Sequence, residues 1–158
     1  MKDTPTTGEA EHRAPQNNLA QEFRSHLAKQ SVLCDRLEAV ADSLPAAVNV
    51  QECLYLAQAM VPTVVHAHRF EEAQVFPLFR DNPQLAEMKA SIERLCYEHM
   101  GDEDYAEQIV NTLREFVKNR QSCNPETMAW MLRGFFEAMR RHIAFEQEHV
   151  LPLLETGH

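Results

Sequence analysis

The sequence predicts an all-α fold, an up-down-up-down four-helix bundle, on three observations. The 158 residues include only 4 glycines and are rich in strong helix formers such as Ala, Leu, Glu, Gln and Arg. Apolar residues recur at alternating intervals of three and four along four long stretches, which is the spacing of one helix face. The connections between these stretches are short, which favours antiparallel neighbours. A chain of this length is expected to form one domain.

Residues 1–17 are predicted to form a disordered tail, because they contain Pro5, Gly8 and Pro15 and show no apolar periodicity. The helical bundle is predicted to occupy residues 18–158. Its first helix is expected over about residues 18–43, and Pro45 ends it. The core face of this helix is apolar with two polar interruptions and consists of Leu19, Phe23, His26, Gln30, Leu33, Leu37, Val40 and Leu44.

The second helix is predicted over about residues 48–80. Pro62 lies inside it, and a proline removes a backbone donor and clashes with the preceding turn, so a kink or a break is expected there. Its predicted core face consists of Leu54, Ala57, Val61, Val64, His68, Glu71, Val75 and Leu78.

The third helix is predicted over about residues 82–119, with Asn82 as N-cap and Pro83 as first helical residue. Its core face consists of Leu85, Met88, Ile92, Leu95, His99, Asp102, Ala106, Ile109, Leu113 and Phe116. The same Asn-Pro signal at Asn124 and Pro125 predicts the start of the fourth helix. Its core face consists of Met128, Leu132, Phe135, Met139, His142, Glu146, His149 and Leu153.

An internal repeat relates the ends of the second and fourth helices. The order Phe-Glu, three residues, Val-x-Pro-Leu occurs in residues 70–78 and again in residues 145–153. The two helices are therefore expected to end alike, and the repeat equates Glu71 with Glu146.

Composition excludes several classes of partner. A formal net charge of -9 argues against a nucleic-acid or an anionic-membrane surface, since both need clustered Lys and Arg. No apolar run approaches the ~20 residues that span a bilayer, no signal peptide is evident, and a cytoplasmic location is expected. The four cysteines form no Cys-x-x-Cys pair and are expected to be free thiols.

One histidine interrupts the apolar face of each helix, namely His26, His68, His99 and His142. These histidines are expected at comparable depth in one half of the bundle. A buried polar group without a partner costs roughly 2 to 7 kcal/mol, so four at one level predict a common ligand, most simply a metal.

Two glutamates are expected to join the histidines. Glu71 follows His68 by three residues and Glu146 follows His142 by four, and side chains at these spacings share a helix face. Imidazole and carboxylate ligands suit non-haem iron or manganese, and bundle cores hold carboxylate-bridged two-metal centres. On this interpretation Glu71 and Glu146 bridge two metal ions, the four histidines are terminal ligands, and a face remains for dioxygen, nitric oxide or peroxide.

Some assignments stay open at this point. Glu72 is an alternative to Glu71: the repeat and the apolar face favour Glu71, whereas the spacing His68-x-x-x-Glu72 favours Glu72. Asp102 and Glu103 are expected to hydrogen-bond ligand imidazoles or to coordinate directly. Three further residues are assigned less closely to the metal: Gln30 as another imidazole partner, His149 as an extra ligand or a structural residue, and His66 as a residue that faces elsewhere.

Four parts of the sequence together resemble the hemerythrin-like proteins of the HHE cation-binding family: His26 in the first helix, residues 68–77, the pair Glu98-His99, and residues 142–152. The resemblance covers everything after the tail. It implies a hemerythrin-like bundle that holds two iron ions in an oxo- or hydroxo-bridged, non-haem di-iron centre with His and bridging Glu ligands. One position departs from the family pattern, which places a histidine four residues before the bridging glutamate of the second helix. Counted from Glu71, that position is Ala67.

The function expected from this resemblance is binding or sensing of oxygen or a related small molecule rather than catalysis. A sensing role would involve a protein partner. The alternative is a di-iron oxidase, a peroxidase-like enzyme or an iron-storage protein, and a metal-free helical interaction domain is the third hypothesis. An iron-sulfur repair role is not expected, because repair proteins of the family carry a further cysteine-containing domain. Oxygen carriers are rich in histidine and ferroxidases in carboxylates, and this chain is intermediate between them.

Overall fold

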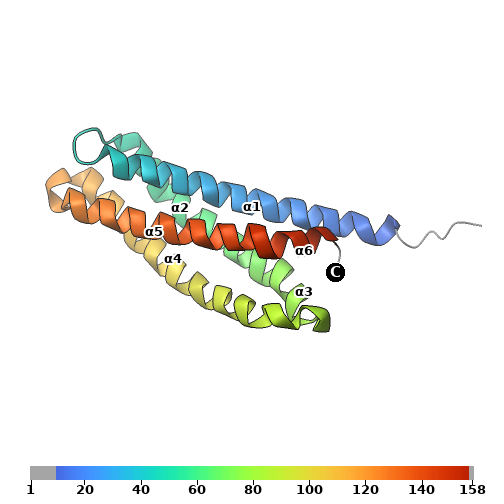
Figure 1. Cartoon of the computed structure of the whole chain (residues 1–158). Helices are drawn as coiled ribbons and strands as arrows, with labels where there is room; N and C mark the ends of the chain where they lie inside the picture. The colour runs from blue at the N-terminus through green and yellow to red at the C-terminus, as the bar shows by residue number, and fades with distance from the viewer. Residues whose placement is uncertain (1–9, 157–158) are drawn as a thin grey trace, which may run out of the picture.

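The chain forms a bundle of four helical rods, which confirms the predicted all-α, up-down-up-down fold (Figure 1). The computed structural model describes residues 10–156. Its α-helices are α1 (Ala10–Ser43), α2 (Val50–Phe70), α3 (Phe76–Arg80), α4 (Lys89–Lys118), α5 (Pro125–Phe145) and α6 (Leu151–Thr156). Shorter turns are the π-helical η1 (Glu71–Val75) and η4 (Glu146–Val150) and the 3-10 turns η2 (Pro83–Met88) and η3 (Arg120–Ser122). Residues 1–9 of the predicted tail lie outside the described residues, and from Ala10 the backbone belongs to α1.

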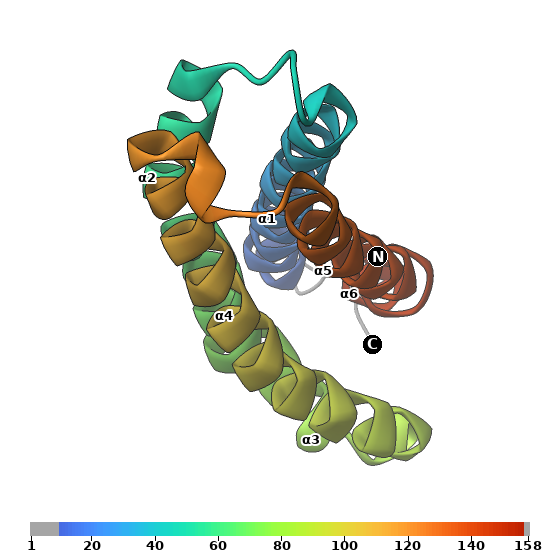
Figure 2. The same cartoon turned by 90° about the vertical axis from the view of Figure 1, so that its left-hand side faces the viewer.

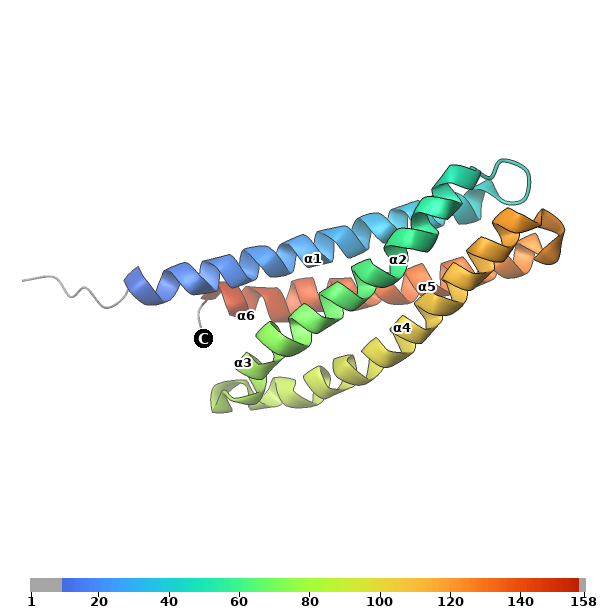
Figure 3. The ribbon, with the colours of Figure 1, turned by 180° about the vertical axis from the view of Figure 1, so that it is seen from behind.

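The rods associate mainly in two pairs. α1 packs along α5 and α2 along α4, while α4 and α5 contact one another over a shorter stretch. The two pairs diverge toward the end of the bundle that holds α3 and α6 (Figures 2 and 3). The core between the rods contains the fully buried Phe23, Phe76, Phe79, Phe135 and Phe136. Each such side chain contributes about 1.5 to 3 kcal/mol on burial.

Asparagine side chains start the rods after the first. Asn82 accepts a hydrogen bond from the backbone N–H of Gln84, and Asn124 accepts from Glu126 and Thr127. The predicted helix starts at these two positions are confirmed, although Asn82 begins a 3-10 turn that then leads into α4. Asn49 caps α2 in the same way.

The second and fourth rods each contain a π-turn at the start of the sequence repeat. The backbone N–H of Phe76 donates to the carbonyl of Glu71, and that of Leu151 donates to the carbonyl of Glu146. Both hydrogen bonds span five residues instead of the four of an α-helix, so each rod gains one extra residue in that turn. The two repeat segments therefore end alike, as expected.

The extra residue corrects the predicted core face beyond each π-turn. Leu78 is 45% exposed, and Phe79 takes its place in the core at 1%. In the fourth rod, the predicted core residue His149 is exposed, and Val150 and Leu154 are buried instead. An apolar spacing of three and four residues assumes an uninterrupted α-helix and does not include the inserted residue. The core positions predicted after each π-turn are therefore one residue too early in the sequence.

The prolines act at different places from the one expected. α2 continues through Pro62, so the predicted break does not occur there. The second rod is interrupted at η1, directly before Pro77 and the start of α3, and the fourth at η4, before Pro152 in α6. Proline has no backbone N–H to donate, and the first residues of a helical segment do not need one. Both prolines are therefore compatible with the new helical segments that begin after the π-turns.

Two further observations concern the chain as a whole. The helices of residues 10–156 include none with both the length and the apolar character that a bilayer crossing requires. All four cysteines are free thiols, which confirms the expectation from their spacing.

Candidate metal centre

Four buried residues from two opposed pairs of rods form a four-residue cluster: Glu71, His99, His142 and Glu146. One ligand atom of each lies within 4.8 Å of those of the others. Glu71 and Glu146 are 0% exposed, His99 is 1% and His142 is 7% exposed. Burial of two carboxylates at one place is costly unless cations or protons compensate their charge.

The π-turns position both carboxylates of the cluster. Glu71 is the first residue of η1 and Glu146 is the first residue of η4, so the internal repeat places one glutamate from each of two rods in the core. π-Turns within α-helices occur frequently at functional sites.

His68 adjoins the four-residue cluster. Its ring stacks on that of His99 with 3.7 Å between ring centroids and an interplanar angle of 5°. His99 in turn stacks on His142 with 5.1 Å between centroids. His68 is 1% exposed, and its Nε2 atom has no hydrogen-bond partner among the described residues. The three imidazoles therefore form a nearly parallel, buried stack.

Each of the three imidazoles faces a carboxylate at the edge of the bundle, and we call Glu72, Asp102 and Glu103 the outer carboxylates. The Nδ1 atom of His68 lies 2.9 Å from Oε1 of Glu103. The Nδ1 atom of His99 lies 2.7 Å from Oε1 of Glu72.

The third pair is looser, since Nδ1 of His142 lies 3.6 Å from Oδ2 of Asp102. In all three pairs the carboxylate comes from a different rod than the histidine. Carboxylates that accept from Nδ1–H fix the tautomer in which Nε2 carries the free lone pair, the arrangement that orients histidine ligands of metals.

The Nε2 atoms of His99 and His142 face the carboxylates of Glu71 and Glu146. Nε2 of His99 lies 3.0 Å from Oε2 of Glu71, and Nε2 of His142 lies 3.0 Å from Oε1 of Glu146. Several buried polar atoms nevertheless lack a hydrogen-bond partner among the described residues: His68 Nε2, both carboxylate oxygens of Glu71, His99 Nε2, His142 Nδ1 and Glu146 Oε2. An unsatisfied buried group costs about 1 to 3 kcal/mol. The nitrogen and oxygen donors converge without sulfur, which fits a site for iron, manganese or zinc.

Burial and mutual repulsion perturb the acid-base behaviour of the cluster. Burial, reinforced by the charge of Glu146, raises the pKa of Glu71 to about 7. Burial, reinforced by His99, lowers the pKa of His68 to about 3.

His142 and His99 shift the other way. Burial alone would lower the pKa of His142, but Asp102 and Glu146 outweigh it and raise the pKa to about 10. Burial alone would likewise lower the pKa of His99, but the contacts of its ring with Glu71 and Glu72 outweigh burial and raise the pKa. In the absence of a cation, protons thus compensate the buried carboxylates, so a bound cation must displace protons.

The remaining predicted ligands lie outside the four-residue cluster. The side chain of Glu72 is 45% exposed and contacts His99 from outside, whereas Glu71 faces the core. His26 of α1 is half-buried, with its ring stacked on Phe70 at 4.7 Å between centroids. Both His66 and His149 are exposed.

Gln30 is buried, but within the described part of the chain it makes no hydrogen bond to these imidazoles. Asp102 and Glu103 were expected as imidazole partners or as ligands. They face the Nδ1 atoms of His142 and His68, respectively.

The contact between Glu72 and His99 was not predicted from the sequence, although the spacing of the residues contains a signal for it. His68 and Glu72 are four residues apart, and so are His99 and Glu103. In the antiparallel pair formed by the second rod and α4 these two motifs exchange partners, since each histidine contacts the glutamate of the other rod. The spacing that favoured Glu72 as a bridging ligand is thus also the spacing of this exchange of hydrogen bonds.

Comparison with known proteins gives one match. The sequence model of the family described as Hemerythrin HHE cation binding domain matches residues 18–154. No curated protein and no solved structure matches the chain.

Proposed function

Because the chain belongs to the hemerythrin HHE cation-binding domain family, we propose that its His/Glu cluster is a non-haem di-iron centre that binds or senses O2 or a related small molecule, such as NO or peroxide. The observation that supports this most strongly is the convergence of buried, unpartnered nitrogen and oxygen atoms from separate rods. Cations at this place would compensate both carboxylates and give every inward atom a partner.

We propose the following roles for the residues. Glu71 and Glu146 would hold the ions through their carboxylates, and His68, His99 and His142 would hold them through Nε2. The outer carboxylates accept from the ligand imidazoles and hold their rings in place. When bound, the iron ions supply the redox chemistry towards O2, while the surrounding apolar side chains exclude water.

His26 is proposed as a further terminal ligand from α1. It lies against Phe70, the residue before Glu71, but outside the four-residue cluster. Replacing His26 by Ala is expected to reduce the bound iron from two ions to one per chain, as measured by elemental analysis. Unchanged iron content in His26→Ala would remove His26 from the ligand set.

An alternative function has some support in the outer carboxylates. Together with Glu71 and Glu146 they surround three stacked histidines with acidic groups, which is closer to the carboxylate-rich sites of iron-oxidising proteins. A di-iron oxidase, a peroxidase-like enzyme or an iron-storage protein is therefore the second candidate. It differs from the first in that iron would turn over with oxygen or accumulate.

The test is metal analysis of the purified chain combined with absorption spectra of the reduced and the air-exposed protein. We expect two iron ions per chain and a spectrum that changes reversibly with oxygen or nitric oxide. Continuous consumption of oxygen or peroxide, or uptake of many ions, would instead support the alternative.

A matched pair of variants links the result to the cluster. Glu146→Gln is expected to lose the iron, whereas Glu148→Gln, an exposed position in the same turn, is expected to retain it. Iron-free wild-type protein that stays without metal on reconstitution, or equal iron content in both variants, would contradict the proposed centre.

We also propose that the protein acts in the cytoplasm with a small-molecule ligand. Four free thiols suit a reducing compartment, and a net charge of -9 disfavours nucleic acid and anionic membranes.

A further inference from the structure

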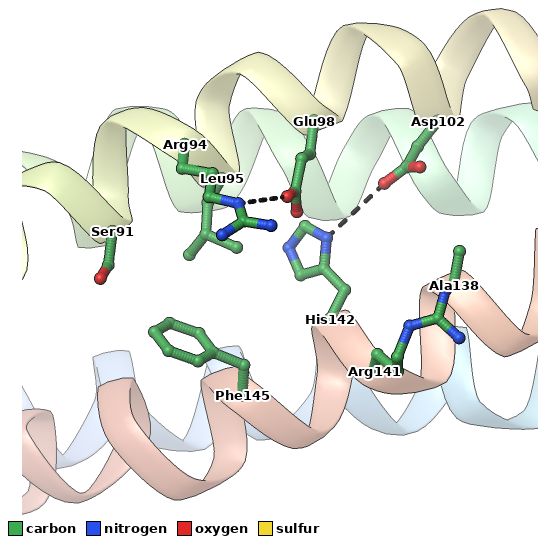
Figure 4. A pocket seen from close by; sticks show the side chains of 9 residues that line it. All are labelled: Ser91, Arg94, Leu95, Glu98, Asp102, Ala138, Arg141, His142 and Phe145. Atoms are coloured by element: carbon green, nitrogen blue, oxygen red, sulfur yellow. Dashed lines mark hydrogen bonds and ion pairs between the residues drawn. The ribbon is translucent and has the colours of Figure 1, made fainter.

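A pocket of about 500 Å³ opens between α4 and α5, and His142 stands in its middle (Figure 4). At 7% exposure His142 is the most accessible member of the four-residue cluster, and the other members are 0 to 1% exposed. The pocket lies where α4 and α5, which share a short contact, leave space between the two pairs of rods. It is therefore the place where a molecule from solvent comes closest to the candidate metal centre.

The size of the pocket exceeds what a diatomic ligand needs. One water molecule occupies about 30 Å³ of the liquid, whereas pockets for small organic ligands measure about 300 to 1,000 Å³. Leu95 and Phe145 supply apolar surface, and Phe145 lies across the pocket from Arg94 (Figure 4). These dimensions and walls suit an organic molecule with an apolar body.

The charges of the pocket leave guanidinium groups available. Arg94 donates from Nε to Oε1 of Glu98 at 2.9 Å, while its terminal nitrogens have no acceptor among the described residues. Asp102 faces His142. Arg141 forms no ion pair with any described residue, so the pairing of the other charges leaves it as a free cation at the pocket wall.

We propose that this pocket binds a small organic carboxylate beside His142. The terminal nitrogens of Arg94 hold the carboxylate, since a guanidinium group matches its planar geometry, and Leu95 and Phe145 cover the apolar body. Arg141, on the other side of His142, adds positive charge to the pocket wall (Figure 4). The inference goes beyond the proposed di-iron function, because none of the four side chains belongs to the proposed metal ligands.

The experiment is a calorimetric titration of the full chain with benzoate and, separately, with neutral benzyl alcohol. We expect saturable binding of one benzoate per chain and at least tenfold weaker binding of benzyl alcohol. Arg94→Gln should weaken benzoate binding about tenfold, because a charge-assisted hydrogen bond is lost, and Arg141→Gln should weaken it less, because only a nearby positive charge is removed. Arg114→Gln, which removes another exposed arginine of α4, should leave the affinity unchanged.

A variant that fills the pocket provides a second readout. Ala138 lines the pocket and is only half-buried, so Ala138→Leu should reduce benzoate binding while the thermal midpoint stays close to that of the wild type. Absence of benzoate binding to the wild type, equal affinity for benzyl alcohol, or equal affinities of Arg94→Gln, Arg141→Gln and Arg114→Gln would each overturn the proposal. Iron content measured on the same samples tests the di-iron centre separately, because benzoate binding without iron would contradict only the metal centre.

Discussion

At the scale of single residues, the reciprocal contacts between the second rod and α4 distinguish the two candidate glutamates. His68 contacts Glu103 and His99 contacts Glu72, so Glu72 is held at the surface while Glu71 remains free to face the core. Neighbouring residues in the sequence thus have different roles: one is proposed as a ligand and the other as its support.

Removal of an outer carboxylate should weaken metal binding without abolishing it. Glu72→Ala is expected to lower iron affinity about 10- to 100-fold, because His99 loses the partner that orients its ring. Glu71→Ala should abolish stoichiometric binding. Competition with a chelator measures both, with Glu107→Ala, an exposed position on α4, as control. If Glu72→Ala lost all metal and Glu71→Ala did not, their roles would be reversed.

The protonated state of His142 makes the stability of the metal-free protein depend on pH. The pKa of His142 rises from 6.5 to about 10 on folding, because Asp102 and Glu146 outweigh the effect of burial. The folded state therefore binds this proton more tightly, and the contribution is complete below pH 6.5 and is lost as the pH rises through 10.

The thermal midpoint of chelator-treated protein should accordingly decrease as the pH is raised from 6.5 to 10. Asp102→Asn removes one cause of the raised pKa and should flatten this dependence. The same slope in wild type and variant would show that other groups produce it.

At the scale of helical elements, the close approach of α4 and α5 depends on Gly134. A Cβ atom at this position would lie 3.0 Å from the hydroxyl of Tyr105. That hydroxyl donates to the carbonyl of Met131 at 2.8 Å. Glycine thus leaves room for a hydrogen bond that joins the two rods.

A double-mutant cycle tests this contact. Gly134→Ala alone should change stability little, because a gain of about 1 kcal/mol in helix propensity is offset by loss of the Tyr105 hydrogen bond, about 1 kcal/mol. In the Tyr105→Phe background the hydroxyl is absent, and Gly134→Ala should stabilise the protein by about 1 kcal/mol in denaturant unfolding. Equal effects in both backgrounds would contradict the contact.

The elements were largely predictable from sequence, and the exceptions have a physical cause. Asn82 and Asn124 predict helix starts because each can cap a helix that begins with the following proline, and the apolar spacing predicts the four rods. The π-turns add a residue that no apolar spacing reveals, so Leu78 and His149 were predicted to be buried and are exposed. The repeat is visible in the sequence. That it marks a wider helical turn at Glu71 and Glu146 is evident only from the backbone hydrogen bonds of the structure. The pairing of outer carboxylates with histidines likewise depends on contacts between rods.

At the scale of the whole molecule, the candidate centre joins the two pairs of rods. Glu71, His68 and His99 come from the pair of the second and third rods, and His142 and Glu146 come from the fourth rod, which packs on α1. The pairs diverge toward α3 and α6, so few direct contacts replace the cluster there (Figure 2). α1 and α2 also contact one another, and bound metal is expected to add a connection between the two pairs at the level of the cluster.

Metal removal should lower the stability of the entire bundle. A ligand present at 1,000 times its Kd stabilises by about 4 kcal/mol, which corresponds to about 10 °C in thermal midpoint for a domain of this size. Calorimetry of metal-loaded and chelated protein measures the shift. Hydrogen exchange should increase most in α3 and α6. A midpoint that is unchanged on chelation, with metal verified before and after, would contradict this role.

The division of donors between distant parts of the chain has a consequence for biosynthesis. Glu71 and Glu146 are separated by the whole of α3, α4 and α5, so a nascent polypeptide on the ribosome has only half of the acidic pair until η4 has been translated. His68 and His99 can already stack at that stage, since α2 and α4 precede α5. The donors of the proposed iron centre would therefore be complete only after translation of the fourth rod.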